Sequence, residues 1–292
     1  MSKEEKSASL FILIGLITGA LVGVAGSQFG DTFNSFPLFG LVVVIAFGIQ
    51  ILGFIPAYIA QTEKYYDITG TVTYVLTTTI ALLLTRSLDI RSFLLGTLII
   101  VWALRLGIFL FKRVHDVGKD GRFDNLKPSF IRYLNAWIIQ GLWVSFTAAA
   151  ALTAISSKDK VEIGTIGLIG LTIWIAGFII EVKADSQKKK FSSNPENRNK
   201  FINEGLWSRS RHPNYFGEIL LWFGVSIISF PVLQGAQLFT LISPIFVYIL
   251  LVKGSGIPIL ERRADKKWGG QPEYEAYKSS TPVLVPKLFS LS

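Results

Sequence analysis

Residues 37–60, PLFGLVVVIAFGIQILGFIPAYIA, form a run of 24 residues without a charged side chain. A helix of that length rises about 36 Å, which exceeds the roughly 30 Å hydrocarbon core of a bilayer. The run lacks the alternation of apolar and polar residues that marks a barrel strand. Because a backbone in lipid must satisfy its own hydrogen bonds, we interpret the run as a transmembrane helix.

Similar apolar runs lie on both sides of this segment along the 292-residue chain. Hydrophobic residues make up 50% of the chain and charged residues 17%, compared with about 25% charged residues in soluble domains. We therefore predict an all-α polytopic transmembrane helical bundle of seven to eight spans, with a short cytoplasmic helical C-terminal tail. The predicted spans are residues 10–29, 37–60, 69–85, 93–111, 133–155, 163–182, 214–230 and 236–253.

Basic residues are unevenly distributed over the predicted loops. With eight spans, 24 of the 29 Lys and Arg residues lie on the side that holds both termini, four lie on the other side, and Arg105 lies within a span. The richer side is cytoplasmic by the positive-inside rule. Orientation thus explains the net charge of +9, and we predict membrane lipids rather than nucleic acid as partners. We expect a bacterial or archaeal plasma membrane.

The chain has no cysteine and only two histidines, His115 and His212. Disulfides and thiolate zinc sites are excluded, and we predict no metal site. We interpret His115 as a solvated loop residue.

Glycines recur at four-residue spacing in the first predicted span, at Gly15, Gly19 and Gly23. Such small residues let helices approach closely, either within one chain or between two copies. The sequence therefore leaves the oligomeric state open.

Two acidic residues, Glu181 and Asp185, lie where the sixth predicted span meets the cytoplasm. They are four residues apart and share one helical face. The following lysines, among them Lys189, are typical of a basic flank. Acidic groups at this depth are uncommon without a polar partner, so we take Glu181 and Asp185 as site candidates.

A polar run leads into the seventh predicted span, and Pro213 can open that helix as its first residue. Asn214 and Glu218 then share a face in its first turns. Arginines and a helix N-terminus suit a phosphate-bearing ligand, whereas an ordinary interfacial anchor would leave Glu218 facing lipid. The candidates in this run are Arg211, His212, Asn214, Tyr215 and Glu218.

Arg105 and Arg113 are eight residues apart on one stripe of the fourth predicted span and its end. An arginine as deep as Arg105 needs a buried anion or a wet cavity. Arg113 can instead snorkel to the membrane surface. We include both as site candidates, together with Arg122 in the loop that follows.

Three residues near the start of the third predicted span, Tyr66, Asp67 and Tyr74, are candidate catalytic residues. Asp67 and Tyr74 are seven residues apart, so both can face the bundle interior. A carboxyl group beside a tyrosine in a desolvated site can polarise a carbonyl. An ordinary loop with an aromatic belt is the alternative.

Several of these motifs resemble the C-terminal domain of the steroid 5-alpha-reductase family, and most closely its uncharacterised bacterial membrane branch. The likeness covers mainly residues 160–292, with a fainter echo in the fourth span. It rests on Glu181-x3-Asp185-x-Gln187-Lys188, Gly205-Leu206-Trp207, Ser210-Arg211-His212-Pro213-Asn214-Tyr215-Phe216-Gly217-Glu218, Trp102-x2-Arg105 and Asp120-x-Arg122.

The resemblance implies a bundle that binds NADPH from the cytoplasmic side. It implies an oxidoreductase acting on CH–CH groups, which transfers hydride to a C=C bond conjugated to a carbonyl. The substrate would be a steroid-like, isoprenoid or lipid molecule that comes from the bilayer. Residues 1–132 would form the substrate side, and residues 133–292 the membrane domain with the cofactor loops.

Individual positions carry over from the family's pattern. Asp185, Asn214 and Glu218 match positions that contact the cofactor, and Arg105 and Arg113 fall in its cofactor-facing stripe. The tail, with Arg263 and Tyr274, resembles a segment that closes over the nucleotide. The basic loops support this independently, because NADPH carries phosphate charges that Lys and Arg neutralise.

One position departs from the family, which has a catalytic tyrosine where this chain has Trp102. An indole N–H cannot serve as a proton donor of comparable acidity. Either Tyr66 or Tyr74 supplies the hydroxyl, with Asp67 or Glu63 as the acidic partner, or the substrate is not a steroid enone.

Two other functions fit parts of the sequence. An isoprenylcysteine-type methyltransferase, which uses S-adenosylmethionine, shares the Arg-His-Pro-x-Tyr pattern and an acidic, aromatic tail. A non-catalytic lipid-binding membrane protein of the same fold would explain Trp102. The density of basic residues favours a phosphorylated cofactor over S-adenosylmethionine.

Overall fold

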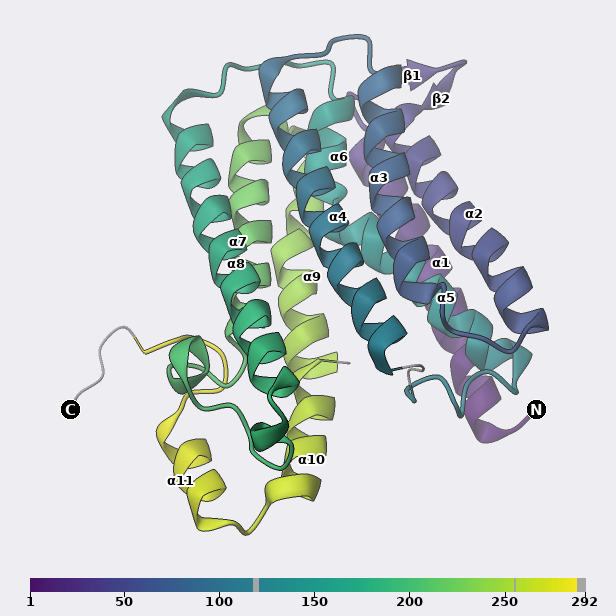
Figure 1. The fold of residues 1–292 in the computed structure, drawn as a ribbon. Helices are drawn as coiled ribbons and strands as arrows, with labels where there is room; N and C mark the ends of the chain where they lie inside the picture. The colour runs from purple at the N-terminus through teal and green to yellow at the C-terminus, as the bar shows by residue number, and fades with distance from the viewer. Residues whose placement is uncertain (118–120, 255, 288–292) are drawn as a thin grey trace. The chain divides into compact units, whose positions relative to one another are not determined.

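A computed structural model of the chain describes residues 1–117, 121–254 and 256–287, and for residues 113–117 it describes the backbone alone. The described chain is mainly helical, with almost no strands (Figure 1). Its α-helices are α1 (Lys3–Ser27), α2 (Leu38–Ile59), α3 (Tyr66–Leu84), α4 (Ile90–Val117), α5 (Phe130–Thr147), α6 (Ala149–Ser156), α7 (Gly164–Ser193), α8 (Pro213–Ser229), α9 (Ser243–Ile249), α10 (Ile257–Trp268) and α11 (Pro272–Ser280).

Short elements connect the helices. Strands β1 (Thr32–Phe33) and β2 (Phe36–Pro37) form an antiparallel hairpin in which Thr32 lies opposite Pro37. Four 3-10 helices, Pro195–Asn197, Gly205–Ser208, Phe230–Val232 and Gly235–Ile242, and a π-helix, Leu250–Gly254, complete the described elements.

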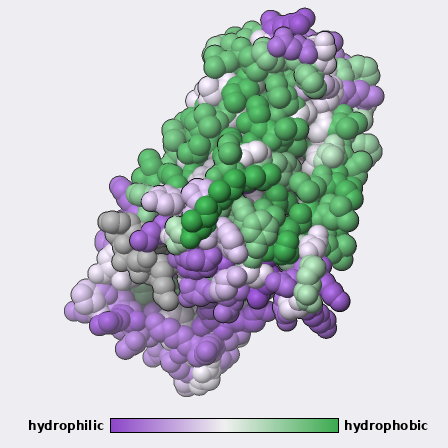
Figure 2. All heavy atoms as spheres, turned by 90° about the vertical axis from the view of Figure 1, so that its right-hand side faces the viewer, coloured by the Kyte–Doolittle hydropathy of each residue, from purple (hydrophilic) through white to green (hydrophobic). Residues whose placement is uncertain are grey.

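Seven helical segments of the described chain are long and apolar enough to cross a membrane. The α5–α6 pair, bent by 57°, would be an eighth. The predicted single span over residues 133–155 is therefore broken near Ala148. Figure 2 shows a face on which apolar side chains form a broad belt with hydrophilic residues beyond it. The predicted fold class, an all-α multi-pass membrane bundle, is confirmed.

The chain divides into two compact units. Unit 1 comprises residues 1–166 and 228–243, and unit 2 comprises residues 167–227 and 244–292. In unit 1, α2 packs against α1, α3 and α5, while α3 also packs against α4 (Figure 1).

The glycine face of α1 packs inside unit 1. Gly19 lies against Phe47 of α2, and Gly15 lies against Ile138 of α5. Large apolar side chains on the other face of α1 are exposed, for example Leu21 at 63%. Of the two uses predicted for these glycines, packing within one chain is thus the one observed.

In unit 2, α7 and α8 meet through glycines at seven-residue spacing. A Cβ added to Gly177 would lie 2.6 Å from the Gly217 carbonyl oxygen, and one added to Gly224 would lie 2.6 Å from the Gly170 carbonyl oxygen. Successive contacts run in opposite directions along the two helices, so α7 and α8 are antiparallel. This close approach brings the last turns of α7 to the first turns of α8.

Candidate functional site

Three carboxylates are buried where the end of α7 meets the beginning of α8. Glu181 is 2% exposed, Asp185 is 6% exposed and Glu218 is 7% exposed. The Asn214 side-chain amide, on α8, donates a hydrogen bond to Asp185 Oδ1 on α7, with the two atoms 3.2 Å apart. Burying this many carboxylates is costly unless each has polar partners, which marks the cluster as a candidate binding site.

Helix α8 begins at the residue that the sequence predicts. Pro213 is its first residue, so Asn214 and Glu218 lie in its first two turns as predicted. Gly217 follows in the same turn and lies directly against the backbone of Glu181. Backbone contact therefore fixes how far the carboxylates of the two helices are from each other.

The Gly205-Leu206-Trp207 motif ties the connecting loop to α7. The Trp207 indole donates to the Ala184 carbonyl at 2.9 Å, and Gln187 Oε1 accepts from the Leu206 N–H at 3.0 Å. Gly205 has φ of +60°, and an added Cβ would meet the Gln187 amide at 2.5 Å. The Lys188 ammonium lies 4.5 Å from the Trp207 ring centroid, a cation–π contact.

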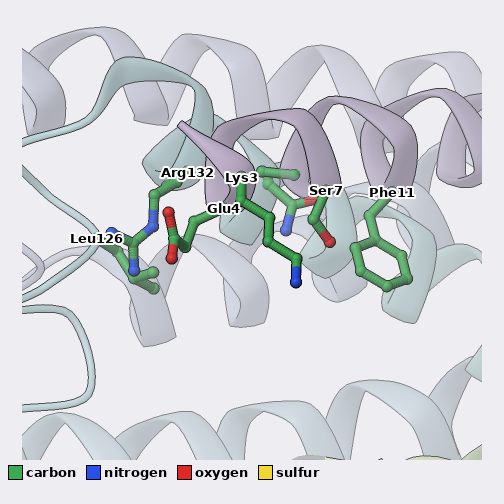
Figure 3. Close-up of a pocket in the computed structure, with 8 residues that line it drawn as sticks. Lys3, Glu4, Ser7, Phe11, Leu126 and Arg132 are labelled. Atoms are coloured by element: carbon green, nitrogen blue, oxygen red, sulfur yellow. The ribbon is translucent and has the colours of Figure 1, made fainter. Parts of the chain in front are cut away.

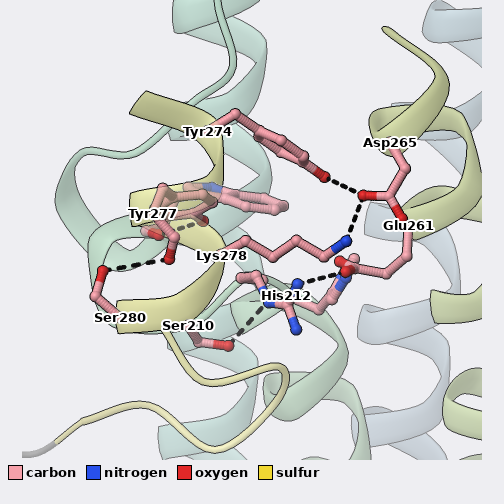
Figure 4. A network of polar contacts seen from close by, with 10 residues as sticks. Ser210, His212, Glu261, Asp265, Tyr274, Tyr277, Lys278 and Ser280 are labelled. Carbon is pink, nitrogen blue, oxygen red and sulfur yellow. Dashed lines mark hydrogen bonds and ion pairs between the residues drawn. The ribbon is translucent and has the colours of Figure 1, made fainter. Parts of the chain in front are cut away.

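The Arg-His-Pro motif is held by an acidic residue of α10 (Figure 4). Glu261 Oε2 lies 2.5 Å from Arg211 Nη1, and Glu261 Oε1 lies 2.7 Å from His212 Nε2. The Arg211 and His212 side chains are both largely buried. The sequence shows an acidic, aromatic tail but does not indicate that Glu261 holds this motif, because the partners of Glu261 lie about 50 residues earlier in the chain.

Two atoms of this motif have no hydrogen-bond partner among the described residues. They are Arg211 Nε, a donor, and His212 Nδ1, and both are buried. The His212 ring also stacks on Tyr215, with centroids 5.8 Å apart. Buried polar atoms are nearly always satisfied in native proteins, so unpaired ones next to a carboxylate cluster indicate a place for a polar ligand.

The end of the chain packs on the same motif. The Tyr277 hydroxyl donates to the Trp207 carbonyl at 2.7 Å, and the Arg211 N–H donates to the Pro282 carbonyl at 2.9 Å. Burial raises the pKa of Tyr277, so its hydroxyl stays protonated at neutral pH. The tail is thus built into unit 2 rather than attached to it by a single contact.

A second interaction holds α10 to α11. Asp265 Oδ1 accepts from the Tyr274 hydroxyl at 2.9 Å and lies 2.5 Å from Lys278 Nζ (Figure 4). Burial and the Asp265 carboxylate raise the pKa of Tyr274. Tyr274, a predicted cofactor residue, therefore acts in this structure as a buried donor within the tail.

The buried His212 predicts a dependence of stability on pH. Burial lowers the pKa of His212, and its hydrogen bond to Glu261 opposes this without reversing it. Below about pH 6.5 the unfolded chain gains a proton at this side chain that the folded chain does not hold. We therefore expect the unfolding free energy to decrease as the pH falls below that value.

His212→Gln is the matched variant for this prediction, because glutamine keeps a donor toward Glu261 but does not titrate. Thermal unfolding in detergent at several pH values between about 5.5 and 8 measures the effect. The wild type should lose more stability on acidification than the variant does. Parallel pH profiles would contradict the assignment.

The other predicted cofactor residues are more dispersed. In unit 2, Lys189 and Arg263 are exposed. In unit 1, the half-buried Arg105 lies 5.5 Å from the Phe109 ring centroid, and Arg122 is exposed. The side chain of Arg113, like residues His115 and Asp120, lies outside the described side chains. The cofactor-binding roles of Lys189, Arg263, Arg105, Arg122 and Arg113 stay predictions.

The predicted catalytic residues all lie in unit 1. The Tyr66 hydroxyl donates to the Ala136 carbonyl at 2.9 Å. Tyr74 is 6% exposed, and its ring lies edge-on to Trp102 with centroids 5.2 Å apart. Asp67, in the first turn of α3, is half-buried.

Two glutamines of unit 1, Gln50 and Gln140, are buried although the sequence analysis does not predict them as site residues. Gln50, fully buried on α2, donates from Nε2 to Thr73 Oγ1 at 2.8 Å, while Thr73 donates to the Thr69 carbonyl. The Oε1 atoms of Gln50 and Gln140 accept no hydrogen bond from the described residues. The sequence feature that could have indicated Gln50 is its amide within the otherwise apolar run of residues 37–60.

Comparisons with known proteins agree with the sequence motifs. Residues 53–281 match the family described as protein of unknown function (DUF1295). Part of the chain is similar to 3-oxo-5-alpha-steroid 4-dehydrogenase 1 from Macaca fascicularis, with 29% identity over 122 residues. That match covers 42% of this chain and 41% of the relative, so it spans less than half of the relative's length. The predicted family resemblance is confirmed.

Proposed function

The chain belongs to the family described as protein of unknown function (DUF1295), and from that premise we propose that it is a membrane-embedded, NADPH-dependent reductase. Its distant similarity to 3-oxo-5-alpha-steroid 4-dehydrogenase 1 suggests an oxidoreductase. The proposed reaction saturates a C=C bond conjugated to a carbonyl in an apolar substrate that reaches the protein from the bilayer. The substrate class is steroid-like, isoprenoid or lipid.

The observation that carries the proposal is the polar cluster at the joined ends of α7 and α8. Carboxylates accept hydrogen bonds from hydroxyl and amide groups, so Glu181, Asp185 and Glu218 suit the ribose hydroxyls and the carboxamide of NADPH. They would repel its phosphates. The unpaired Nε of Arg211 is a donor that suits a phosphate oxygen. The carboxylate acceptors and this arginine donor together therefore fit a dinucleotide.

When bound, NADPH supplies the reducing equivalents, and the protein supplies position and electrostatics. The carbonyl oxygen of an enone gains negative charge as its double bond is reduced, so the site needs a hydrogen-bond donor there. Tyr74 is our candidate for this donor, because its ring lies beside Trp102. Trp102 stands where the steroid 5-alpha-reductase family has its catalytic tyrosine. The Tyr66 hydroxyl would first have to break its hydrogen bond to the Ala136 carbonyl before it could donate to the substrate.

A titration of the purified protein with NADPH tests the proposal. We expect Asp185→Ala and Glu218→Ala each to weaken NADPH binding about 10- to 100-fold, as the loss of a hydrogen bond to a charged group predicts. Glu196→Ala, which removes an exposed acid of unit 2, is the matched control and should bind as the wild type does. Thermal stabilisation by NADPH provides a second readout.

Tyr74→Phe separates binding from chemistry in the same experiment. This variant should keep its NADPH affinity and lose turnover against a panel of enones. If NADPH does not bind, or if Asp185→Ala and Glu218→Ala bind it unchanged, the proposal is wrong. Stabilisation by S-adenosylmethionine instead of NADPH would favour the methyltransferase.

A further inference from the structure

A surface pocket of about 500 Å³ lies in unit 1, between the first turns of α1 and the beginning of α5 (Figure 3). Lys3, Glu4 and Ser7 of α1 line it on one side, and Arg132 and Asn135 of α5 line it on the other. None of these residues belongs to the proposed cofactor or catalytic site. The pocket therefore needs an explanation of its own.

The lining changes from charged to apolar along α1. Lys3 and Glu4 lie in the first turn, Ser7 in the second and Phe11 in the third, and Phe11 is 53% exposed. The next residues on the exposed side of α1, such as Ile14 and Leu21, are large and apolar. Because α1 is a candidate membrane span, this gradient places the pocket where the membrane surface meets the hydrocarbon.

The charged part of the pocket contains both signs. Lys3 and Arg132 are cations, and Glu4 is an anion near enough to Arg132 for their charges to interact (Figure 3). Asn135 adds a buried Oδ1 atom that accepts no hydrogen bond from the described residues. A ligand with a phosphate and an adjacent N–H cation would satisfy all four groups at once.

We propose that this pocket binds the headgroup of a zwitterionic aminophospholipid from the surrounding leaflet. Its phosphate lies against Lys3 and Arg132, and its primary ammonium lies against Glu4 and Asn135 Oδ1. Its acyl chains follow Phe11 and the exposed apolar face of α1. A phosphatidylglycerol headgroup would bring no cation to Glu4, and a choline headgroup has no N–H to donate to Asn135.

Native mass spectrometry of the purified protein tests this with phosphatidylethanolamine, phosphatidylcholine and phosphatidylglycerol that carry identical acyl chains. We expect phosphatidylethanolamine to bind about tenfold more tightly than the other two. Arg132→Gln should weaken binding of all three lipids. Glu4→Gln should remove the preference for phosphatidylethanolamine and leave phosphatidylglycerol binding unchanged or stronger.

Lys6→Gln is the matched control, because it removes a nearby cation of α1 that does not line the pocket. Ser7→Trp, which fills the pocket, should abolish the preference without changing the charge. Soluble phosphoethanolamine should not bind, since the acyl chains are part of the contact. Equal binding of the three lipids, tightest binding of phosphatidylglycerol, or an equal loss in Lys6→Gln would overturn the proposal.

Discussion

Gly217→Ala is expected to lower the free energy of unfolding by about 3 kcal/mol, at the upper end of the cost of overpacking. The added Cβ would lie 2.6 Å from both the Glu181 nitrogen and the Gly177 carbonyl oxygen. These are backbone atoms, so no side-chain rotation relieves the clash, and α7 and α8 must separate. We expect NADPH binding to be lost as well, because the separation would pull Asp185 away from Asn214.

Gly48→Ala is the matched control for this prediction. Gly48 lies on α2, and an added Cβ there would have no atom within 4 Å. Alanine favours a helix over glycine by up to about 1 kcal/mol, so this variant should be as stable as the wild type or slightly more stable. The seven tryptophans allow thermal unfolding in detergent to be followed by intrinsic fluorescence. Equal melting temperatures for the two variants would contradict the glycine contact.

Glu261→Gln is expected to cost about 3 kcal/mol of unfolding free energy, the lower end of the cost of breaking a buried charge pair, because the Glu261 side chain is 21% exposed. The substitution leaves the Arg211 guanidinium, whose side chain is only 12% exposed, without its carboxylate. It also removes the carboxylate that faces His212. Glutamine keeps the shape of the side chain, so the effect is electrostatic. Urea denaturation or thermal unfolding in detergent measures it.

Asp265→Asn is the comparison variant, since it lies one helical turn after Glu261 on α10 and also has a cation at 2.5 Å. The two side chains of that pair are 44% and 31% exposed, and exposed pairs contribute about 0–1 kcal/mol. We therefore expect a small loss for Asp265→Asn and a large loss for Glu261→Gln. Comparable losses would mean that burial does not control the strength of these pairs.

Much of the fold could be predicted because its signals are local. A charge-free run such as residues 37–60 predicts a membrane helix wherever it lies in the bundle, and α2 covers residues 38–59. Pro213 fixes the start of α8 through its own backbone restrictions. The break between α5 and α6 could not be predicted, because residues 133–155 are continuously compatible with a helix and only packing bends them.

The candidate site was predicted in part. Four-residue spacing put Glu181 and Asp185 on one face of a helix, and the structure buries both of them. The hydrogen bond between Asn214 and Asp185 joins two helices, so no spacing within one helix indicates it. Gln50 is visible in the sequence as an amide within an apolar run, but a single residue has no periodic pattern that would assign it to a site.

The sequence by itself determined that the chain crosses the membrane repeatedly as helices, and which polar residues lie at the ends of those helices. Both properties follow from hydropathy and from helical periodicity over neighbouring residues. Only the tertiary structure decided that Glu261 holds Arg211 and His212, and that glycines let the backbones of α7 and α8 touch. Those contacts join residues about 40 to 55 positions apart, where pairing depends on shape and burial rather than on any local pattern.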